Sequence, residues 1–158
     1  MLNARSAMNV KKCLVASGVL IAALIPCIAA AALGEPEASV QTDALQLRGS
    51  IHVTEHASYR LHEIQLPSGT LVREFVGADG KVFAVAWRGP AAPNLRQMLG
   101  RYFEPFAAAA GAHRTGHSHL QIQTGDLVVQ AGGHMRAMAG RAYLPAGVPN
   151  GVDLGELH

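Results

Sequence analysis

Hydrophobic and polar positions alternate most clearly in the middle of this 158-residue chain. Alternation with a period of two places successive side chains on opposite faces of a β-sheet, so each such run predicts a strand. Three runs follow one another: residues 59–66, 70–76 and 81–88. Pro67-Ser68-Gly69 separates the first two runs, and Asp79-Gly80 separates the last two. Asp-Gly is typical of a two-residue hairpin turn, because both central residues need a positive φ.

The Asp79-Gly80 turn also predicts which residues face each other in this hairpin. The expected opposite pairs are Ala78 with Lys81, Val76 with Phe83, Glu74 with Val85, and Val72 with Trp87. The last three pairs share one face, which we expect to be buried. Glu74 then points into the core, where a carboxylate has to find an arginine or take up a proton.

A helical period replaces the alternation after Gly89-Pro90. Apolar residues recur three and four positions apart, as in an amphipathic helix: Leu95, Met98, Leu99, Tyr102, Phe103 and Phe106. Gly100 and Pro105 predict a kink or break near Glu104. Residues 107–116 are mostly small and read as a loop.

Three further strands are expected beyond that loop: residues 118–122, 127–131 and 135–144. Thr124-Gly125-Asp126 supplies the first turn, and Gly132-Gly133 supplies a second turn or a bulge. The tail from about residue 146 is rich in Gly and Pro and reads as irregular.

Ahead of the first strand, residues 39–47 predict a short leading helix with Ser39 as its N-cap. Residues 49–57 are polar and poorly periodic and read as a loop. The order is therefore three strands, a helix and three strands. Strands joined by short turns pair antiparallel, so we expect an α+β domain. It consists of an antiparallel sheet of about six strands, with one main helix packed on a face.

The first 32 residues have the pattern of a secretory signal peptide. Three basic residues precede an apolar run over residues 14–25, and Pro26 and four alanines follow it. Cleavage after Ala31 or Ala32 fits this pattern. The product is a single domain over residues 33–158, which we expect in the periplasm or secreted from the cell.

Two alternatives to cleavage stay open: a membrane anchor over residues 13–33 and a lipoprotein anchored through Cys27. Cys13 and Cys27 are the only cysteines, so the mature domain has no disulfide and no cysteine zinc ligand. Removing the leader leaves ten basic against eleven acidic side chains. Nucleic acid is therefore excluded as a partner, because it requires a clustered excess of Lys and Arg. Membrane contact is expected only through the transient signal peptide.

Two arginines are the candidate ligand-binding residues. Arg73 and Arg88 are expected as diagonal neighbours on the exposed sheet face, with Cβ atoms about 5–8 Å apart. Two planar guanidinium groups can hold a carboxylate or a phosphate bidentately. The alternative is that one of them pairs with Glu74, Glu63 or Asp79 and only neutralises charge.

Histidines supply the candidate metal ligands: His113, His117 and His119. His117 and His119 are two residues apart and would share a strand face, and imidazole pairs suit Zn, Cu or Ni. The alternative is an exposed polar face without bound metal. We predict no other cofactor and no catalytic residue.

A second histidine pattern, from His52 to His56, matches the H-x-x-E-H motif of inverted zinc peptidases. That chemistry needs both histidines on one face of a helix, with Glu55 beside them as general base. Gly49, Ser50 and three β-branched residues argue against a helix here. A solvated loop is the better explanation.

Six stretches of the chain can be compared with a known family: residues 32–35, 69–76, 80–90, 95–100, 132–136 and 140–145. Together they resemble the family of small exported Gram-negative proteins catalogued as domain of unknown function 2844. The resemblance implies an exported protein of a Gram-negative bacterium. It carries over no activity, ligand or catalytic residue.

From the sequence we therefore expect a non-enzymatic exported domain that binds an unknown protein or a small anionic ligand on its sheet surface. The alternative is a metal-binding or metal-dependent hydrolytic protein that uses the histidine clusters.

Overall fold

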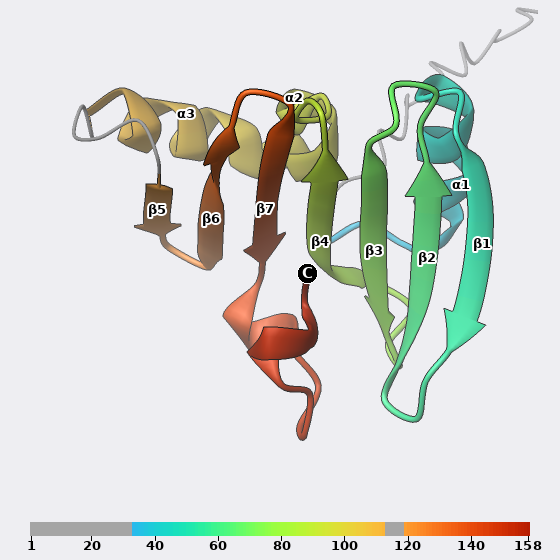
Figure 1. The fold of residues 1–158 in the computed structure, drawn as a ribbon. Helices are drawn as coiled ribbons and strands as arrows, with labels where there is room; N and C mark the ends of the chain where they lie inside the picture. The colour runs from blue at the N-terminus through green and yellow to red at the C-terminus, as the bar shows by residue number, and fades with distance from the viewer. Residues whose placement is uncertain (1–32, 113–118) are drawn as a thin grey trace, which may run out of the picture.

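The fold is built on one antiparallel sheet of seven strands, in the spatial order β1-β2-β3-β4-β7-β6-β5 (Figure 1). The computed structural model describes residues 33–112 and 119–158. The strands are β1 (Ser50–Glu55), β2 (Tyr59–Gln65), β3 (Leu71–Gly77), β4 (Val82–Gly89), β5 (His119–Thr124), β6 (Leu127–His134) and β7 (Ala137–Tyr143). The expected α+β class and antiparallel pairing are confirmed, whereas the expected six strands are one too few.

The strand that the sequence did not indicate is β1. It pairs with β2 from Ser50 opposite Gln65 to Glu55 opposite Arg60, so the expected loop over residues 49–57 is wrong. The strand lies at the edge of the sheet, and its side chains are exposed or half-buried. An edge strand with no buried face leaves no clear alternation in the sequence, because the hydrophobic pattern records burial.

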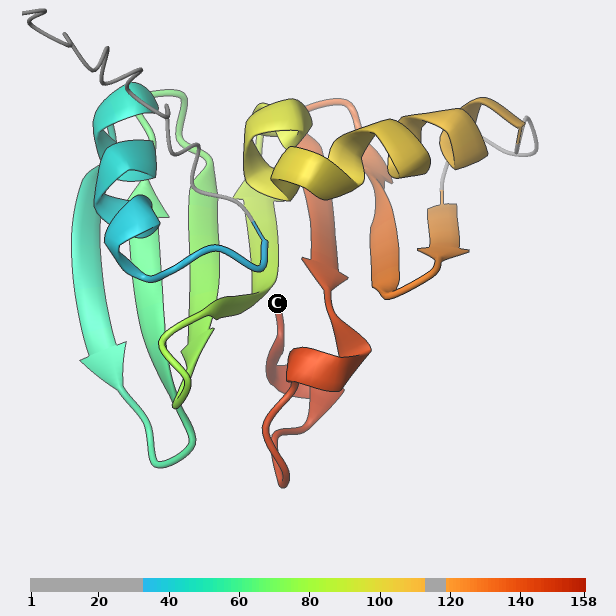
Figure 2. The same ribbon diagram turned by 180° about the vertical axis from the view of Figure 1, so that it is seen from behind.

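The helices lie together on one face of the sheet (Figure 2). They are α1 (Ala38–Gln46), α2 (Leu95–Leu99), the 3-10 turn η1 (Gly100–Tyr102) and α3 (Phe103–Ala112). On this helix face the main core includes Val72, Val76, Val82, Val85, Trp87, Ile122 and Val129 from the strands, with Val40, Met98, Leu99 and Phe106 from the helices. Trp87 is 3% exposed and belongs to this core, as its alternation predicted.

The hairpin of β3 and β4 follows the expected register except beside its turn. Val72 faces Trp87 and Glu74 faces Val85, as predicted. Val76 faces Val82 instead of Phe83, because the register shifts between Phe75 and Val76. The turn is also one residue longer than expected, since the Gly77 amide donates to the Lys81 carbonyl oxygen. Phe83 consequently turns to the opposite face, where it contacts Phe75.

The helical segments differ from the predicted ones at their ends. The amphipathic helix breaks at Gly100, whose φ of 49° favours glycine, and not near Glu104. Pro105 lies in the first turn of α3, where its missing amide hydrogen costs no helical hydrogen bond. The expected loop from residue 107 is instead the alanine-rich body of α3, which continues to Ala112.

The leading helix is confirmed, but its cap is not Ser39. The helix begins at Ala38 with Glu37 in the N-cap position. The Ser39 hydroxyl instead donates a hydrogen bond to the Pro36 carbonyl oxygen at 2.6 Å.

In the second half of the sheet, Gly132-Gly133 is not a turn. Both glycines pair within β6, opposite Ala139 and Met138 of β7. The turn comes two residues later, where Arg136 adopts a positive φ of 67°. These two glycines therefore leave part of β6 without side chains.

The chain after β7 is irregular, as expected, with short 3-10 turns η2 (Pro145–Gly147) and η3 (Leu154–Glu156). It nevertheless packs on the sheet face opposite the helices. Leu157 is 0% exposed and joins a second core with Phe75, Phe83 and Tyr143. The tail is thus a structural part of the domain.

No helix in the described ranges is long and apolar enough to cross a membrane. The predicted signal peptide, over residues 1–32, lies outside the residues that the structure describes.

Candidate ligand-binding site

One row of mostly polar side chains crosses the whole sheet on the face opposite the helices, which we call the open face. The row consists of His52, Glu63, Arg73, Ala86, Arg141, Gln130 and Gln121, one from each strand. Neighbouring strands lie about 4.8 Å apart, so each side chain can reach the next. Arg73 Nε donates to Glu63 Oε1 at 2.8 Å, and Arg141 Nε donates to Gln130 Oε1 at 2.8 Å.

A second row lies beside the first on the open face and is largely stripped of side chains. It runs from Arg88 on β4 through Ala139 and Gly132 to His119 on β5. Two long side chains therefore stand at its ends, with only a methyl group and a hydrogen between them. Glycine is unusual inside a strand and often marks a place where a ligand approaches the backbone closely.

The predicted arginine pair is present, but its two members have different roles. Arg73 is bonded to Glu63, which is the charge-pairing alternative. Arg88 is exposed and has no ion-pair partner among the described residues. Its diagonal neighbour on the other side is Arg141, because Ala86 faces Arg141 and Arg88 faces Ala139. Diagonal neighbours lie within about 5–8 Å at Cβ, so Arg73 and Arg141 flank Arg88 from its two sides.

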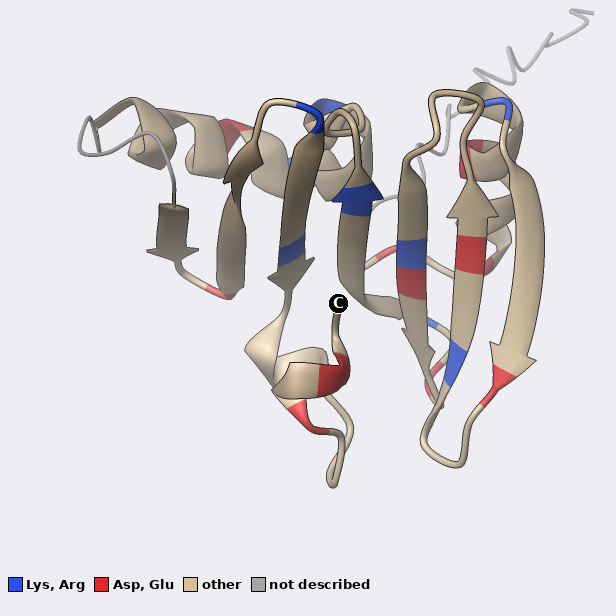
Figure 3. Ribbon diagram, in the orientation of Figure 1, with Lys and Arg blue, Asp and Glu red and all other residues tan. Residues whose placement is uncertain are grey.

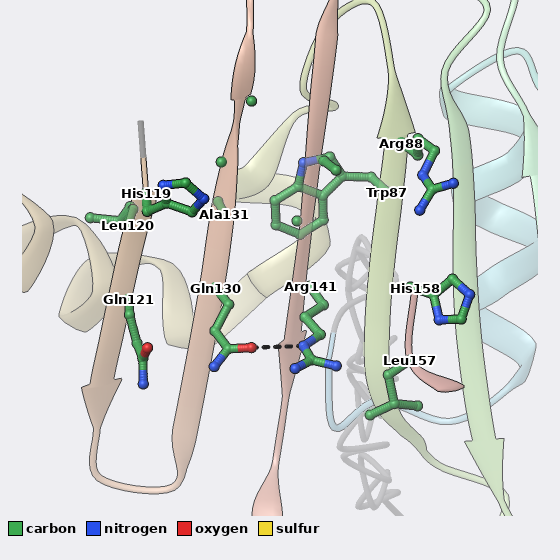
Figure 4. A pocket seen from close by; sticks show the side chains of 14 residues that line it. Trp87, Arg88, His119, Leu120, Gln121, Gln130, Ala131, Arg141, Leu157 and His158 are labelled. Carbon is green, nitrogen blue, oxygen red and sulfur yellow. Dashed lines mark hydrogen bonds between the residues drawn. The ribbon is translucent and has the colours of Figure 1, made fainter. Parts of the chain in front are cut away.

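These two rows border an open groove of about 500 Å³ over β4, β7, β6 and β5 (Figure 4). Arg88 stands at one end, on β4, with its side chain directed toward β3, and Arg141 follows on the neighbouring strand β7. His119 and Gln121 stand at the other end, on β5. Leu157 and His158 of the tail close the arginine end. The volume falls in the range of pockets that bind small molecules.

Among the described residues, no side chain that lines the groove carries a negative charge. The four strands beneath it contain no Asp or Glu in their sequence, and no acidic side chain is among the described residues that line it. Figure 3 accordingly shows blue bands on β4 and β7 and no red band on β4 to β7. Two like charges side by side repel each other, and an anion placed between them replaces that repulsion with attraction.

The tail holds the arginine side chains in place. Nη1 of Arg141 donates to the Leu154 carbonyl oxygen, and Nη1 of Arg73 donates to the backbone oxygen of His158. The Leu154 carbonyl oxygen is a neutral acceptor, so it orients the Arg141 guanidinium group and leaves its charge uncompensated. The Gln130 side chain and the Leu154 carbonyl oxygen together hold the Arg141 side chain from two sides.

Comparison with known families identifies the chain at this point. The family described as "Protein of unknown function (DUF2844)" matches residues 29–157. The chain belongs to this family. No curated protein and no solved structure matches it. The resemblance expected from the sequence is confirmed, and the groove is therefore a site on a member of DUF2844.

The histidines of this DUF2844 chain are only partly placed. His119 stands at the β5 end of the groove, whereas His113 and His117 lie outside the described residues. Within residues 33–112 and 119–158, no group of three or more His, Cys, Asp or Glu side chains could hold a metal ion. A metal site at His113, His117 and His119 stays a prediction.

The H-x-x-E-H pattern falls on β1 and the residue after it. In a strand, His52 and Glu55 point to opposite faces, because they are an odd number of positions apart. The His56 ring stacks on Tyr59, with 4.5 Å between ring centroids. This arrangement differs from the single helical face that a zinc peptidase of this class needs.

A separate group of ionisable side chains is buried under α1, on the helix face. Glu74 is 1% exposed and Asp43 is 0% exposed. Burial raises the pKa of the Glu74 carboxyl well above its ordinary value, and the charge of Asp43 and a hydrogen bond with it raise it further. Gln97 Nε2 donates to Asp43 Oδ1 at 2.6 Å. The raised pKa favours the protonated form of Glu74, whose neighbour is the Asp43 carboxyl.

Arg141 is the site residue that the sequence reasoning missed. It lies in the strand that was expected over residues 135–144, so its existence on a sheet was foreseen. Its nearness to Arg88 depends on β7 pairing with β4, and these strands are separated in sequence by the helices, β5 and β6. No local pattern in the sequence specifies that pairing.

Proposed function

We propose that this protein is an exported binding module of the cell envelope, acting in the periplasm or outside the cell on a small anionic ligand. Arg88 and Arg141 hold the anion, and the domain carries out no chemistry on it. The observation that supports the proposal is the groove itself. Its described lining has two guanidinium groups, two imidazoles and no carboxylate side chain.

The two arginines suit a carboxylate or a phosphate. Arg141 is oriented by Gln130 and by the Leu154 carbonyl oxygen, so little freedom is lost when a ligand binds. Arg88 is exposed and can close onto the bound anion from the neighbouring strand. Planar guanidinium groups give bidentate hydrogen bonds to such ligands, which a lysine would not.

The experiment uses the single tryptophan of the chain, Trp87, which lines the groove. The purified protein is titrated with acetate and, separately, with inorganic phosphate, while Trp87 fluorescence and the thermal midpoint are followed. We expect saturable binding of at least one anion, weakened by added chloride because salt screens the charges. The arm that saturates distinguishes the two ligand classes.

Arg88→Gln and Arg141→Gln should each weaken binding about tenfold or more, since a hydrogen bond to a charged group contributes about 1.5–3 kcal/mol. The matched control is Arg96→Gln, which removes one positive charge from α2, on the helix face of the sheet and away from the groove. Equal losses in all three variants would mean that only the net charge matters. Absence of saturation by either anion in the wild-type protein would overturn the proposal.

A further inference from the structure

The groove extends beyond the two arginines toward β5, and its floor there consists of backbone and one methyl group. Between Arg88 and His119 the open face presents only Ala139 and Gly132. Bare backbone and a methyl group offer no side-chain hydrogen bond to a ligand lying on them. This stretch of floor therefore favours an apolar body over a second charged or hydrogen-bonding group.

Polar side chains border the floor, and an aromatic ring lies beneath it. The row of Arg141, Gln130 and Gln121 borders it on one side, with Gln130 already engaged by Arg141. Beneath the floor, the Trp87 ring packs against β7 at Gly140, where an added Cβ would lie 2.6 Å from Trp87 Cε2. The indole lies so close because residue 140 has no side chain. The result is a shallow trough with an apolar base and a cationic end.

We propose that the ligand of this groove is an elongated carboxylic acid with an unbranched or flat apolar body. Its carboxylate lies at Arg88 and Arg141, and its body follows the Ala139–Gly132 floor toward β5. This inference rests on the proposed function and adds the ligand class to it. A small inorganic anion would use the arginines and leave the rest of the trough empty.

The length of the trough sets the length of the ligand. Arg88 and His119 are separated by the spacing between four neighbouring strands, roughly 14 Å at about 4.8 Å for each step. An extended alkyl chain of about twelve carbons has this length, at about 1.3 Å along the chain for each bond. His119 stands where such a chain would leave the sheet.

The test is a chain-length series of straight alkanoates, from acetate through hexanoate and decanoate to tetradecanoate, each followed by Trp87 fluorescence. Each added methylene that lies on the floor should tighten the dissociation constant by up to about fourfold, which corresponds to about 0.8 kcal/mol. The gain should stop at about twelve carbons, which lies between decanoate and tetradecanoate. Isothermal titration calorimetry repeats the measurement without relying on the tryptophan.

A matched pair of variants locates the apolar body. Ala139→Phe places a large side chain on the floor, and we expect it to abolish the gain in affinity from hexanoate to decanoate. Ala137→Phe is the control, because Ala137 is exposed on the same face of the same strand but does not line the groove. The thermal midpoint without ligand shows that both variants are folded.

The outcomes separate this inference from the proposed function. If acetate and decanoate bind equally well, the apolar trough is wrong while the anion site stands. If the affinity continues to rise by the same factor for each methylene through tetradecanoate, or if Ala139→Phe and Ala137→Phe behave alike, binding is unspecific and the trough is again wrong. If no alkanoate and no phosphate binds, the proposed function fails as well.

Discussion

The buried carboxyl pair under α1 gives a sharp prediction for Glu74→Gln. Glu74 keeps its proton in the folded protein at a pH where it would lose it in the unfolded chain, because burial and the neighbouring Asp43 raise its pKa. Its side chain lies on the helix face between His62 of β2 and Val85 of β4, with Asp43 above it on α1. Glutamine has nearly the same shape and cannot ionise.

The sign of the pH dependence follows from the raised pKa. Below the unfolded pKa, both states hold the proton and Glu74 costs nothing. As the pH rises above that value, the unfolded chain gives up its proton first. The free energy of unfolding then falls by about 1.4 kcal/mol for each pH unit, until the folded pKa is passed.

We therefore expect wild type and Glu74→Gln to be close in stability near pH 4, and the variant to become the more stable of the two toward neutral pH. The assay is urea unfolding followed by Trp87 fluorescence at intervals from pH 4 to pH 8. The difference between the two free energies reports the Glu74–Asp43 pair, because the groups away from this pair titrate alike in both proteins. The control, Glu55→Gln at an exposed position, keeps the buried pair and should keep the wild-type slope.

A constant difference between wild type and Glu74→Gln across this range would refute the reasoning. It would mean that the pKa of Glu74 is the same in the folded protein as in the unfolded chain.

Two further predictions concern packing around the groove. Gly140→Ala should lower the free energy of unfolding by about 1–3 kcal/mol in urea, because the new Cβ collides with the buried Trp87 ring; an unchanged midpoint would show that the ring has room to move. Leu157→Ala should cost about 2–5 kcal/mol, since Leu157 is 0% exposed. The control, Leu154→Ala at a 37% exposed position, should cost less than about 0.5 kcal/mol. Equal effects of the two leucine variants would mean that the tail does not pack as described.

Local patterns were sufficient for the elements that have a buried face. The alternation around Val72 and Trp87 gave the faces of β3 and β4 correctly, because one side of each strand is immersed in the core. The same logic placed Glu74 inside. It failed for β1, because the side chains of this edge strand are only exposed or half-buried.

The exact ends of turns and helices could not be predicted from the sequence either. The one-residue change beside Gly77 turned Phe83 to the open face, and a tight turn of either length is compatible with Asp79-Gly80. The run of alanines after Phe106 looked like a loop because it has little hydrophobic contrast, although alanine favours helix strongly. Such choices are decided by tertiary contacts that differ by small free energies.

By itself, the sequence determined the class of the domain, the antiparallel hairpins, the helix that covers them and the presence of an arginine on an exposed face. Only the tertiary structure decided that Arg141 also stands beside Arg88. That choice depends on β7 returning from the far edge of the sheet to pair with β4, so that Arg141 and Arg88 meet over a floor of Ala139 and Gly132. Side-chain periodicity specifies which face a residue occupies, because burial acts within each strand. It does not specify which strands become neighbours, because that depends on the packing of the whole chain.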